Sequence, residues 1–446
     1  MTVARGSDDL VVGPGALMCL RLRAPRWACR LAAVALSAAI AGPLSAQPPE
    51  LGSDVQGLLE VARAQSPELA AMRQETDAAA QRVQPAGALP DPLLRVELMN
   101  MREWLNEASP TPLPWRVGET KYTLMQTLPG WGKRDLKRDA AAADAQQARA
   151  RSASTWAELA MRIKIAFAES YRAVGNERLI REVLDLMARL EQIAQARYAG
   201  GLAAQQDAIR AQLEQTAMRS ELIALDNEKR QLRARLNSLL ARDAAAPLAE
   251  PQGLRPLPAL TTTDAAALVQ QARANNPALQ VEQARLEAAQ KSRDLAFRNR
   301  GPDFQIGVSP TQLRSRITSW GLMFEMNIPL QQETRRSQEQ EAQAMVGAAQ
   351  SRAMALSNQL LGELAGQLAA FDTARRTEAL LATQLIPQSD VSLQSALAAY
   401  EAGKADFATL LDAQRQIRKA RQTLLQAQVD AQMRLAEIER ILGEDL

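Results

Sequence analysis

Histidine is absent from this chain of 446 residues, and cysteine occurs only twice, at Cys19 and Cys29. The lack of histidine removes the side chain that most often serves as a general base and as a metal ligand. Aromatic residues make up only 4% of the chain, which argues against a large, compact core. The motifs of serine hydrolases, nucleotide-binding loops and paired-cysteine sites are also missing. The sequence therefore predicts a protein that is not an enzyme and that holds no cofactor or structural metal.

The N-terminal segment has the pattern of an export signal. Five arginines precede the apolar run at 31–42, four of them within 21–30, and the run is followed by Pro-Leu-Ser-Ala at 43–46. A basic region, a short apolar region and small residues before a cleavage site are typical of a secretory signal peptide, and the run is too short to span a bilayer as a helix. We expect a signal peptide at 1–46, with a buried N-terminal helix as the alternative. Two aspartates upstream of the arginines within 21–30 favour a start of synthesis at Met18.

The net charge of +3 comes entirely from this segment. Residues 47–446 contain 48 basic and 48 acidic residues, so this part of the chain is neutral. Cleavage after Ala46 would also remove both cysteines and leave no thiol. A neutral chain gives no indication of a nucleic-acid partner, and the export signal predicts a location outside the cytoplasm.

The remainder of the sequence consists of two related halves. The string LLEVARAQSPEL at 58–69 corresponds to LVQQARANNPAL at 268–279, and a Tyr-x-x-Gly string occurs at 198–201 and again at 400–403. Repetition over such a distance indicates a duplicated architecture. We therefore expect three segments, namely the signal at 1–46, a first repeat at 47–250 and a second repeat at 251–446.

Each half shows the same order of predicted elements: a helix, two strands joined by a loop, a very long helix, a tight turn and a return helix. Alternating apolar and polar residues predict strands at about 93–99, 121–128, 303–308 and 320–328. The loop between the strands is longer in the first half, at 100–120, than in the second, at 309–319. A soluble antiparallel sheet with one face in water is the alternative for these strands.

The predicted helices exceed the usual length in globular proteins. Residues 134–199 and 333–401 contain almost no helix breakers, and each segment would extend roughly 100 Å at about 1.5 Å per residue. We expect the hairpins to turn at 199–202 and 401–404. The return helices carry apolar residues every seven positions, which is typical of coiled-coil packing: Met218, Leu225, Leu232 and Leu239 in the first, and Leu410, Ile417, Leu424, Ala431 and Ile438 in the second.

The signal peptide, the duplicated order of elements and the Tyr-x-x-Gly turns together resemble the TolC-type outer-membrane efflux family. This resemblance covers the whole chain after the signal. Three stretches are similar to signatures of its heavy-metal branch, the CusC/CzcC-like channels: GALPDPLL at 87–94, QTLPGWGK at 126–133, and LIPQSD with AAYEAGKADFATLLDAQR within 385–415.

The resemblance implies a mainly α-helical fold with a β-barrel portion, in which long antiparallel coiled coils form a periplasmic tunnel. Each protomer would contribute four strands, so that a homotrimer closes a twelve-stranded barrel through the lipid of the outer membrane. Closure leaves no strand edge exposed to lipid. The implied function is a passive duct that exports substrate, heavy-metal cations first, with a periplasmic adaptor and an RND-type inner-membrane pump as partners. Drug or solvent efflux and type I secretion are the alternative substrates and pathways.

The resemblance also assigns roles to residues near the two turns. A tip that docks the adaptor is implied at Arg197, Tyr198, Gly201, Leu202, Gly403 and Lys404. A gate is implied at Asp207, Tyr400 and Asp412: a bond from Tyr400 to Asp207 would latch the closed state, and three copies of Asp412 would form an acidic constriction. Two positions depart from the family pattern, because Thr409 replaces a second acidic residue and Ala405 replaces an arginine latch.

Simpler interpretations exist for each of these residues. The glycines of the turns also act as ordinary helix caps, and Asp412 could be a surface charge paired with Arg415 or Gln416. For the whole chain, a periplasmic adaptor is an alternative of a different class, but it would need only one helical hairpin. A secreted fibrous coiled coil is another, but it would not contain matched strand pairs in two repeats.

Overall fold

The computed structural model describes residues 51–99, 119–258, 265–313 and 316–446, all within a single unit that spans Pro49–Leu446. The predicted signal peptide, its cleavage site, both cysteines and Met18 lie outside the described residues.

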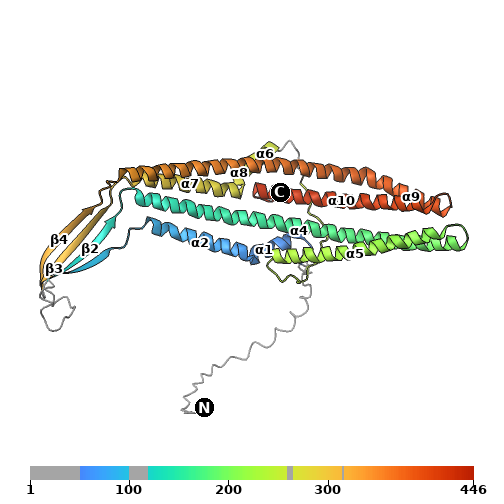
Figure 1. Ribbon diagram of the computed structural model, residues 1–446, viewed down its shortest axis with the longest axis horizontal. Helices are drawn as coiled ribbons and strands as arrows, with labels where there is room; N and C mark the ends of the chain where they lie inside the picture. The colour runs from blue at the N-terminus through green and yellow to red at the C-terminus, as the bar shows by residue number, and fades with distance from the viewer. Residues whose placement is uncertain (1–50, 100–118, 259–264, 314–315) are drawn as a thin grey trace, which may run out of the picture. The chain divides into compact units, whose positions relative to one another are not determined.

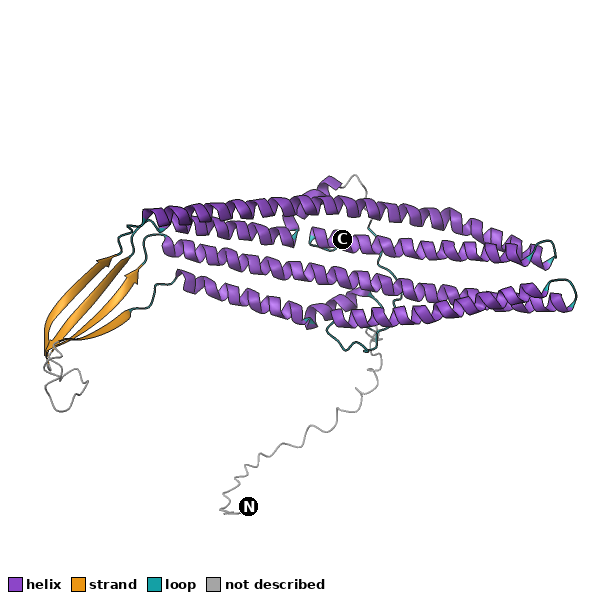
Figure 2. Ribbon diagram, in the orientation of Figure 1, coloured by secondary structure: helices purple, strands orange, loops and turns teal. Residues whose placement is uncertain are grey.

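The two halves of the chain contain the same succession of helices and strands (Figures 1 and 2). The first half consists of α1 (Val55–Gln65), α2 (Pro67–Gly87), β1 (Leu93–Met99), β2 (Glu119–Leu128), α4 (Lys133–Ala199) and α5 (Gln205–Leu239). The second half consists of α6 (Ala265–Asn275), α7 (Pro277–Arg298), β3 (Phe304–Leu313), β4 (Arg316–Met326), α8 (Gln332–Leu380), a π-helical turn (Leu381–Leu385), α9 (Ile386–Glu401) and α10 (Phe407–Leu442). The predicted fold class, mainly helical with four strands, is confirmed.

The same local chemistry begins the second helix of each half. Ser66 precedes Pro67, and its hydroxyl accepts a hydrogen bond from the backbone N–H of Leu69 at 3.4 Å. Asn276 precedes Pro277, and its side chain accepts from the N–H of Leu279 at 2.9 Å. A polar N-cap followed by proline at the first helical position is a strong start signal, so α2 and α7 begin at equivalent points.

The second long helix is not continuous, which corrects the expectation for 333–401. A π-helical turn at Leu381–Leu385 separates α8 from α9. Pro387 has no N–H to donate and its ring crowds the carbonyl of Thr383, so the turn before it widens. The first long helix, α4, has no such interruption and matches the expected bounds closely.

The four strands form one antiparallel sheet in the order β1-β2-β3-β4. β3 and β4 are longer than predicted, because Pro310 and the polar residues after it obscured the alternation. A register shift lies between Thr311 and Gln312. Most of the loop expected at 309–319 is therefore strand, and only 314–315 fall outside the described residues.

The two faces of the sheet differ sharply in polarity. One face carries a cross-strand row of exposed apolar side chains, namely Leu94, Leu124, Val308 and Leu322. The other face carries the row Glu97, Lys121, Thr311 and Ser319. Leu322 is 90% exposed, and no described helix packs on the apolar face. A soluble sheet would cover that face, so the arrangement excludes a half-buried soluble sheet.

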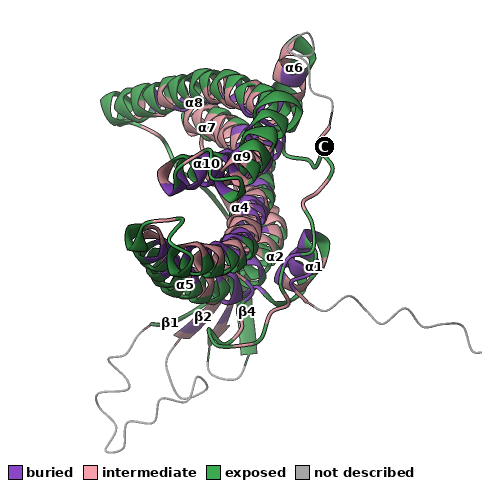
Figure 3. Cartoon of the chain, turned by 90° about the vertical axis from the view of Figure 1, so that its right-hand side faces the viewer, coloured by how far each residue is buried: buried purple, intermediate pink, exposed green. Residues whose placement is uncertain are grey.

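The helices form a curved layer rather than a closed bundle (Figure 3). α4 is the central helix: α2 and α7 pack against it near the sheet, and α5 and α10 pack against it toward the hairpin turns. α8 packs against α7 and α10 at one border of the layer. Apolar side chains fill the layer in three clusters, one of which lies near the turns and includes Tyr400 and Phe407.

Candidate functional site

The two hairpin turns have the same backbone geometry. Gly201 and Gly403 both have φ of 72°, in the left-handed region that glycine adopts without steric cost. The N–H of Leu202 donates to the carbonyl of Arg197 at 2.8 Å, and the N–H of Lys404 donates to the carbonyl of Ala399 at 2.8 Å. This is the six-residue closure that ends a helix at a left-handed residue.

The tyrosines of the two turns lie in different environments although they occupy equivalent positions. Tyr198 is 49% exposed, whereas Tyr400 is 2% exposed. Phe407 packs against Tyr400 in an edge-to-face arrangement, with the ring centroids 5.5 Å apart. The residue equivalent to Phe407 in the first hairpin is Gln205, which provides no ring. The second turn therefore has an aromatic pair that the first lacks.

Arg197 at the end of α4 reaches from the first turn to the second. Its guanidinium carbon lies 4.9 Å from the centroid of the Tyr400 ring. One terminal nitrogen donates to the backbone carbonyl of Tyr400 and, at 3.3 Å, to that of Glu401. The other donates to the carbonyl of Leu202 at 3.4 Å, within its own turn. A single side chain thus contacts both hairpins.

Asp207 lies in the first turn of α5, next to the buried Tyr400. Burial raises the pKa of the Tyr400 hydroxyl, and the nearby Asp207 carboxylate raises it further, while Arg197 opposes this effect. Within the part of the chain that the structure describes, the Tyr400 hydroxyl makes no hydrogen bond. Asp207 and Tyr400, the two predicted latch residues, therefore lie close together but are not hydrogen-bonded.

The other predicted gate positions lie at the start of α10. Asp412 is exposed. Arg415, its expected surface partner, forms its ion pair with Glu214 at 2.8 Å, and the nearby Asp412 carboxylate makes a smaller contribution to raising the pKa of Arg415. Thr409 donates from its hydroxyl to Asp406 at 2.5 Å and from its backbone N–H at 3.0 Å. The threonine that departs from the family pattern therefore belongs to the N-terminal cap of α10.

The predicted docking residues differ in accessibility. Tyr198, Leu202 and Lys404 are exposed, as are both glycines. A Cβ placed at Gly201 would meet no atom within 4 Å, so the first turn is open on that side. Arg197 is only partly exposed because its guanidinium is directed at the second turn.

Two ion pairs that were not predicted connect α5 with α10 further from the turns. Glu214 on α5 pairs with Arg415 on α10, and Glu221 pairs with Arg418 at 3.1 Å. These helices are joined by long side chains, while each packs its backbone closely against α4. The sequence shows the charges but not which helices are neighbours, so the pairs could not be found from it.

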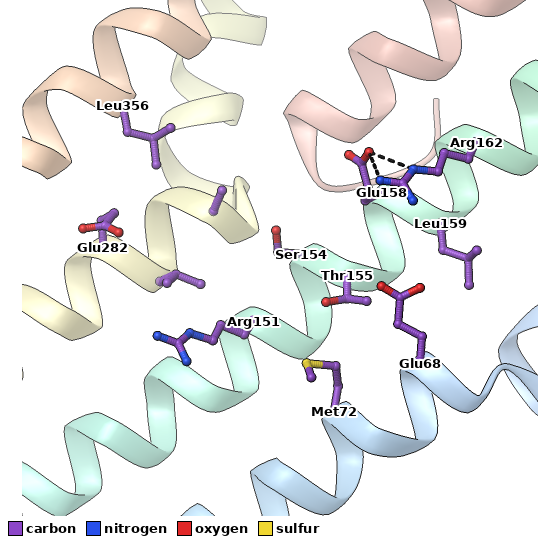
Figure 4. Close-up of a pocket in the computed structure, with 12 residues that line it drawn as sticks. Glu68, Met72, Arg151, Ser154, Thr155, Glu158, Leu159, Arg162, Glu282 and Leu356 are labelled. Carbon is purple, nitrogen blue, oxygen red and sulfur yellow. Dashed lines mark hydrogen bonds and ion pairs between the residues drawn. The ribbon is translucent and has the colours of Figure 1, made fainter.

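A cavity of about 430 Å³ lies among α2, α4, α7 and α8 (Figure 4). Its lining mixes carboxylates with arginines, and Arg162 donates to Glu158 at 3.0 Å. It contains none of the predicted tip or gate residues. Among the described residues, no three His, Cys, Asp or Glu side chains are grouped so as to hold a metal ion. No helix in the described ranges is both long and apolar enough to cross a bilayer.

A sheet with an exposed apolar face and a polar opposite face is the arrangement found in membrane channels, and the chain has the features of a channel subunit. A family model described as "Outer membrane efflux protein" matches residues 58–242 and 268–444, one stretch in each repeat. The chain therefore belongs to the outer membrane efflux protein family. It is a non-enzymatic outer-membrane channel protein whose helices form a periplasmic tunnel.

Several solved structures share the fold. CusC has a TM-score of 0.74 and 16% identity over 89% of this chain and 97% of its own. VceC from Vibrio cholerae has a TM-score of 0.73 and 19% identity over 88% and 96%. The outer-membrane channel OprN has a TM-score of 0.73 and 19% identity over 87% and 89%. No curated protein matches the chain in sequence.

Proposed function

We propose that this protein is the passive outer-membrane duct of a tripartite efflux system and that it exports heavy-metal cations. It works as a homotrimer with a periplasmic adaptor and an RND-type pump in the inner membrane. The observation that carries the proposal is the four-stranded sheet, which has an uncovered apolar face and two borders without a described partner strand.

The sheet supports a trimer because four strands are too few to enclose a pore. β1 and β4 lie at its borders, and each pairs with only one neighbour in the described part of the chain. Placing β4 of one protomer beside β1 of the next continues the sheet. Three copies give twelve strands and no remaining edge, which is the condition for a sheet in lipid.

The borders of the helical layer support the same assembly. On α5 the exposed apolar residues are Ile209, Leu213 and Ile223. On the opposite border they are Leu380, Leu385 and Val391. Leu213 and Val391 each lie twelve residues from the glycine of their own turn, so the two stripes are at matching heights. Head-to-tail contact between unlike borders produces a closed ring when the rotation allows it.

The tip residues support a gate and a docking surface in this duct. Asp207 beside Tyr400 supports the latch, and the exposed Asp412 would face its two copies around a threefold axis and attract cations. Tyr198, Leu202 and Lys404 are accessible to an adaptor. The metal substrate rests on the strings at 87–94, 126–133 and 385–415, which are similar to the heavy-metal branch.

Deletion of the gene followed by resistance profiling tests the substrate. We expect sensitivity to one or more of copper, silver, zinc, cobalt and cadmium. Sensitivity to drugs alone would contradict the assignment of metal cations as the substrate, but it would not contradict the proposal that the protein is an efflux duct. Failure of the purified protein to form channels in planar bilayers would contradict the duct itself.

Substitutions at the turns test the gate. Asp207→Ala and Tyr400→Phe should raise the basal conductance of purified channels in planar bilayers, because each removes one partner of the bond that the proposed latch would form. Asp226→Ala is a matched control on the same helix as Asp207, since Asp226 forms its one ion pair among the described residues with Arg230 on the exposed surface. Equal conductance in all three variants and the parent would refute the latch.

A further inference from the structure

Arg197 breaks the symmetry between the two hairpin turns. The first turn reads Arg-Tyr-Ala-Gly-Gly at 197–201, and the second reads Ala-Tyr-Glu-Ala-Gly at 399–403. The backbone hydrogen bonds of the two turns are the same, so the arginine is not needed to form a turn. Its side chain is instead directed across to the second hairpin, where no equivalent arginine exists to return the contact.

We propose that Arg197 is a positioning residue that clamps the second hairpin against the first and thereby holds the tip closed. This proposal rests on the proposed gate and names the side chain that holds that gate closed. Arg197 is consequently engaged within its own protomer in the closed state and is not free to bind an adaptor there.

The geometry of the contact favours a clamp over incidental packing. The guanidinium donates to two successive carbonyls at the end of α9, those of Tyr400 and Glu401, and also lies against the Tyr400 ring. A cation at the C-terminal end of a helix is stabilised by the exposed carbonyls. Arginine is suited to this because its planar fork bonds two acceptors while stacking on an aromatic face.

The second turn is shaped to admit the guanidinium. A Cβ at Gly403 would lie 3.2 Å from a terminal nitrogen of Arg197, whereas a Cβ at Gly201 would meet nothing. Phe407 packs edge-to-face against the Tyr400 ring. Tyr400, Phe407 and Gly403 therefore form a binding surface in the second hairpin for the Arg197 side chain of the first.

Arg197 also makes the only described side-chain hydrogen bonds that join the two turns. The ion pairs of Glu214 and Glu221 connect α5 with α10 further from the tip. Ala405 stands where the family pattern has an arginine latch, and its methyl group cannot replace that bond. Within the described residues, Arg197 thus supplies the polar contacts between the turns, in addition to the apolar packing around Tyr400.

The test compares Arg197→Gln and Arg197→Lys with the parent channel in planar bilayers. Loss of charge-assisted hydrogen bonds should increase the open fraction by about tenfold or more for the glutamine variant. The lysine variant keeps the charge but lacks the fork, so its open fraction should lie between the two. Arg189→Gln is the matched control, an exposed arginine on the same helix, and should behave as the parent.

Limited trypsin digestion gives a second readout that does not require channel activity. Lys404 lies in the second turn, and cleavage after it, followed by mass spectrometry, reports release of that turn. Faster cleavage after Lys404 in Arg197→Gln but not in Arg189→Gln supports the clamp, even when channels cannot be recorded. Unchanged cleavage and unchanged open fraction would overturn it. A parent protein that forms no channels would instead refute the proposed function, while digestion still decides the clamp.

Discussion

Glu439 near the end of α10 offers a sharp test of how the helical layer is held together. Its side chain is only 3% exposed and accepts hydrogen bonds from Lys164 on α4 at 2.8 Å and from Arg255 at 3.0 and 3.1 Å. It also accepts from the backbone N–H of Leu446 at 3.2 Å. One carboxylate therefore joins α4, the segment between the repeats and the residues after α10.

Replacing Glu439 with Gln should lower the free energy of unfolding by about 3 kcal/mol. Breaking a buried ion pair by removing one partner costs roughly 3–5 kcal/mol because the other charge stays buried. The lower end applies here because Lys164 retains its bond to Asp445. The neutral Gln amide keeps the shape and one acceptor, so the loss reports the charge rather than a cavity.

Urea unfolding in detergent at fixed protein concentration measures this loss, since concentration changes the apparent stability of an oligomer. Glu158→Gln is the control, because Glu158 pairs with Arg162 at 2.9 Å and the two side chains are 41% and 50% exposed. Such a pair contributes only about 0–1 kcal/mol. A loss for Glu439→Gln that is no larger than the loss for Glu158→Gln would refute the reasoning.

A double substitution separates the cost of the unpaired charge from the value of the pair. Lys164→Met with Glu439→Leu removes both charges and fills the volume with apolar groups, which is often neutral or stabilising. Arg255 is less buried than Lys164 and can reach water. We expect the double variant to be more stable than Glu439→Gln. A double variant that is less stable than Glu439→Gln would show that the Lys164–Glu439 pair itself stabilises the fold.

Three further predictions concern the tip, the end of α10 and the sheet. The pKa of Tyr400 in the folded state is raised above the ordinary tyrosine value of 10.0. The contribution of this protonated hydroxyl to stability is therefore intact below pH 10.0 and is lost as the pH rises through the raised pKa. Tyr400→Phe should reduce the loss of unfolding free energy at alkaline pH. Gly443→Ala should lower the free energy of unfolding in urea by about 2 kcal/mol. The reason is that φ of Gly443 is 79° and that the new Cβ would lie 2.6 Å from the backbone oxygen of Asn275. A loss of stability smaller than that caused by a Gly→Ala change at an exposed glycine would contradict this prediction. Leu322→Arg should cost about 2–4 kcal/mol if this residue faces the middle of the bilayer and should reduce heat-modifiable trimer in the outer membrane, whereas Ser319→Arg on the polar face should not.

The duplicated architecture could be predicted because both copies repeat the signals that start and end helices. Asn276-Pro277 repeats Ser66-Pro67, and the glycines of the two turns repeat as well, so helix order and turn positions followed from short-range chemistry. The strands were less certain because Pro310 interrupts the alternation inside β3. The π-helical turn before Pro387 was also missed, since a proline in a long helix produces either a kink or a wider turn.

The tip could be predicted only in part. The resemblance pointed to Tyr400 and Asp207, and the structure places them side by side. The direction of Arg197 and the burial of Tyr400 depend on which hairpin lies next to which, and this information is not local to any stretch of sequence. Glu214 and Arg415 pose the same problem: each looks like a solvated charge until two helices some two hundred residues apart are brought together.

The unlike borders of each protomer have a genetic consequence. In the proposed trimer, β4 and α9 of every subunit meet β1 and α5 of its neighbour, so a subunit damaged at one border also leaves an intact border of another subunit unpaired. A cell that makes damaged and intact subunits in equal amounts would keep only about one eighth of its trimers free of the damaged form. Border substitutions should therefore be dominant over the intact gene, whereas substitutions confined to the interior of the layer should be recessive.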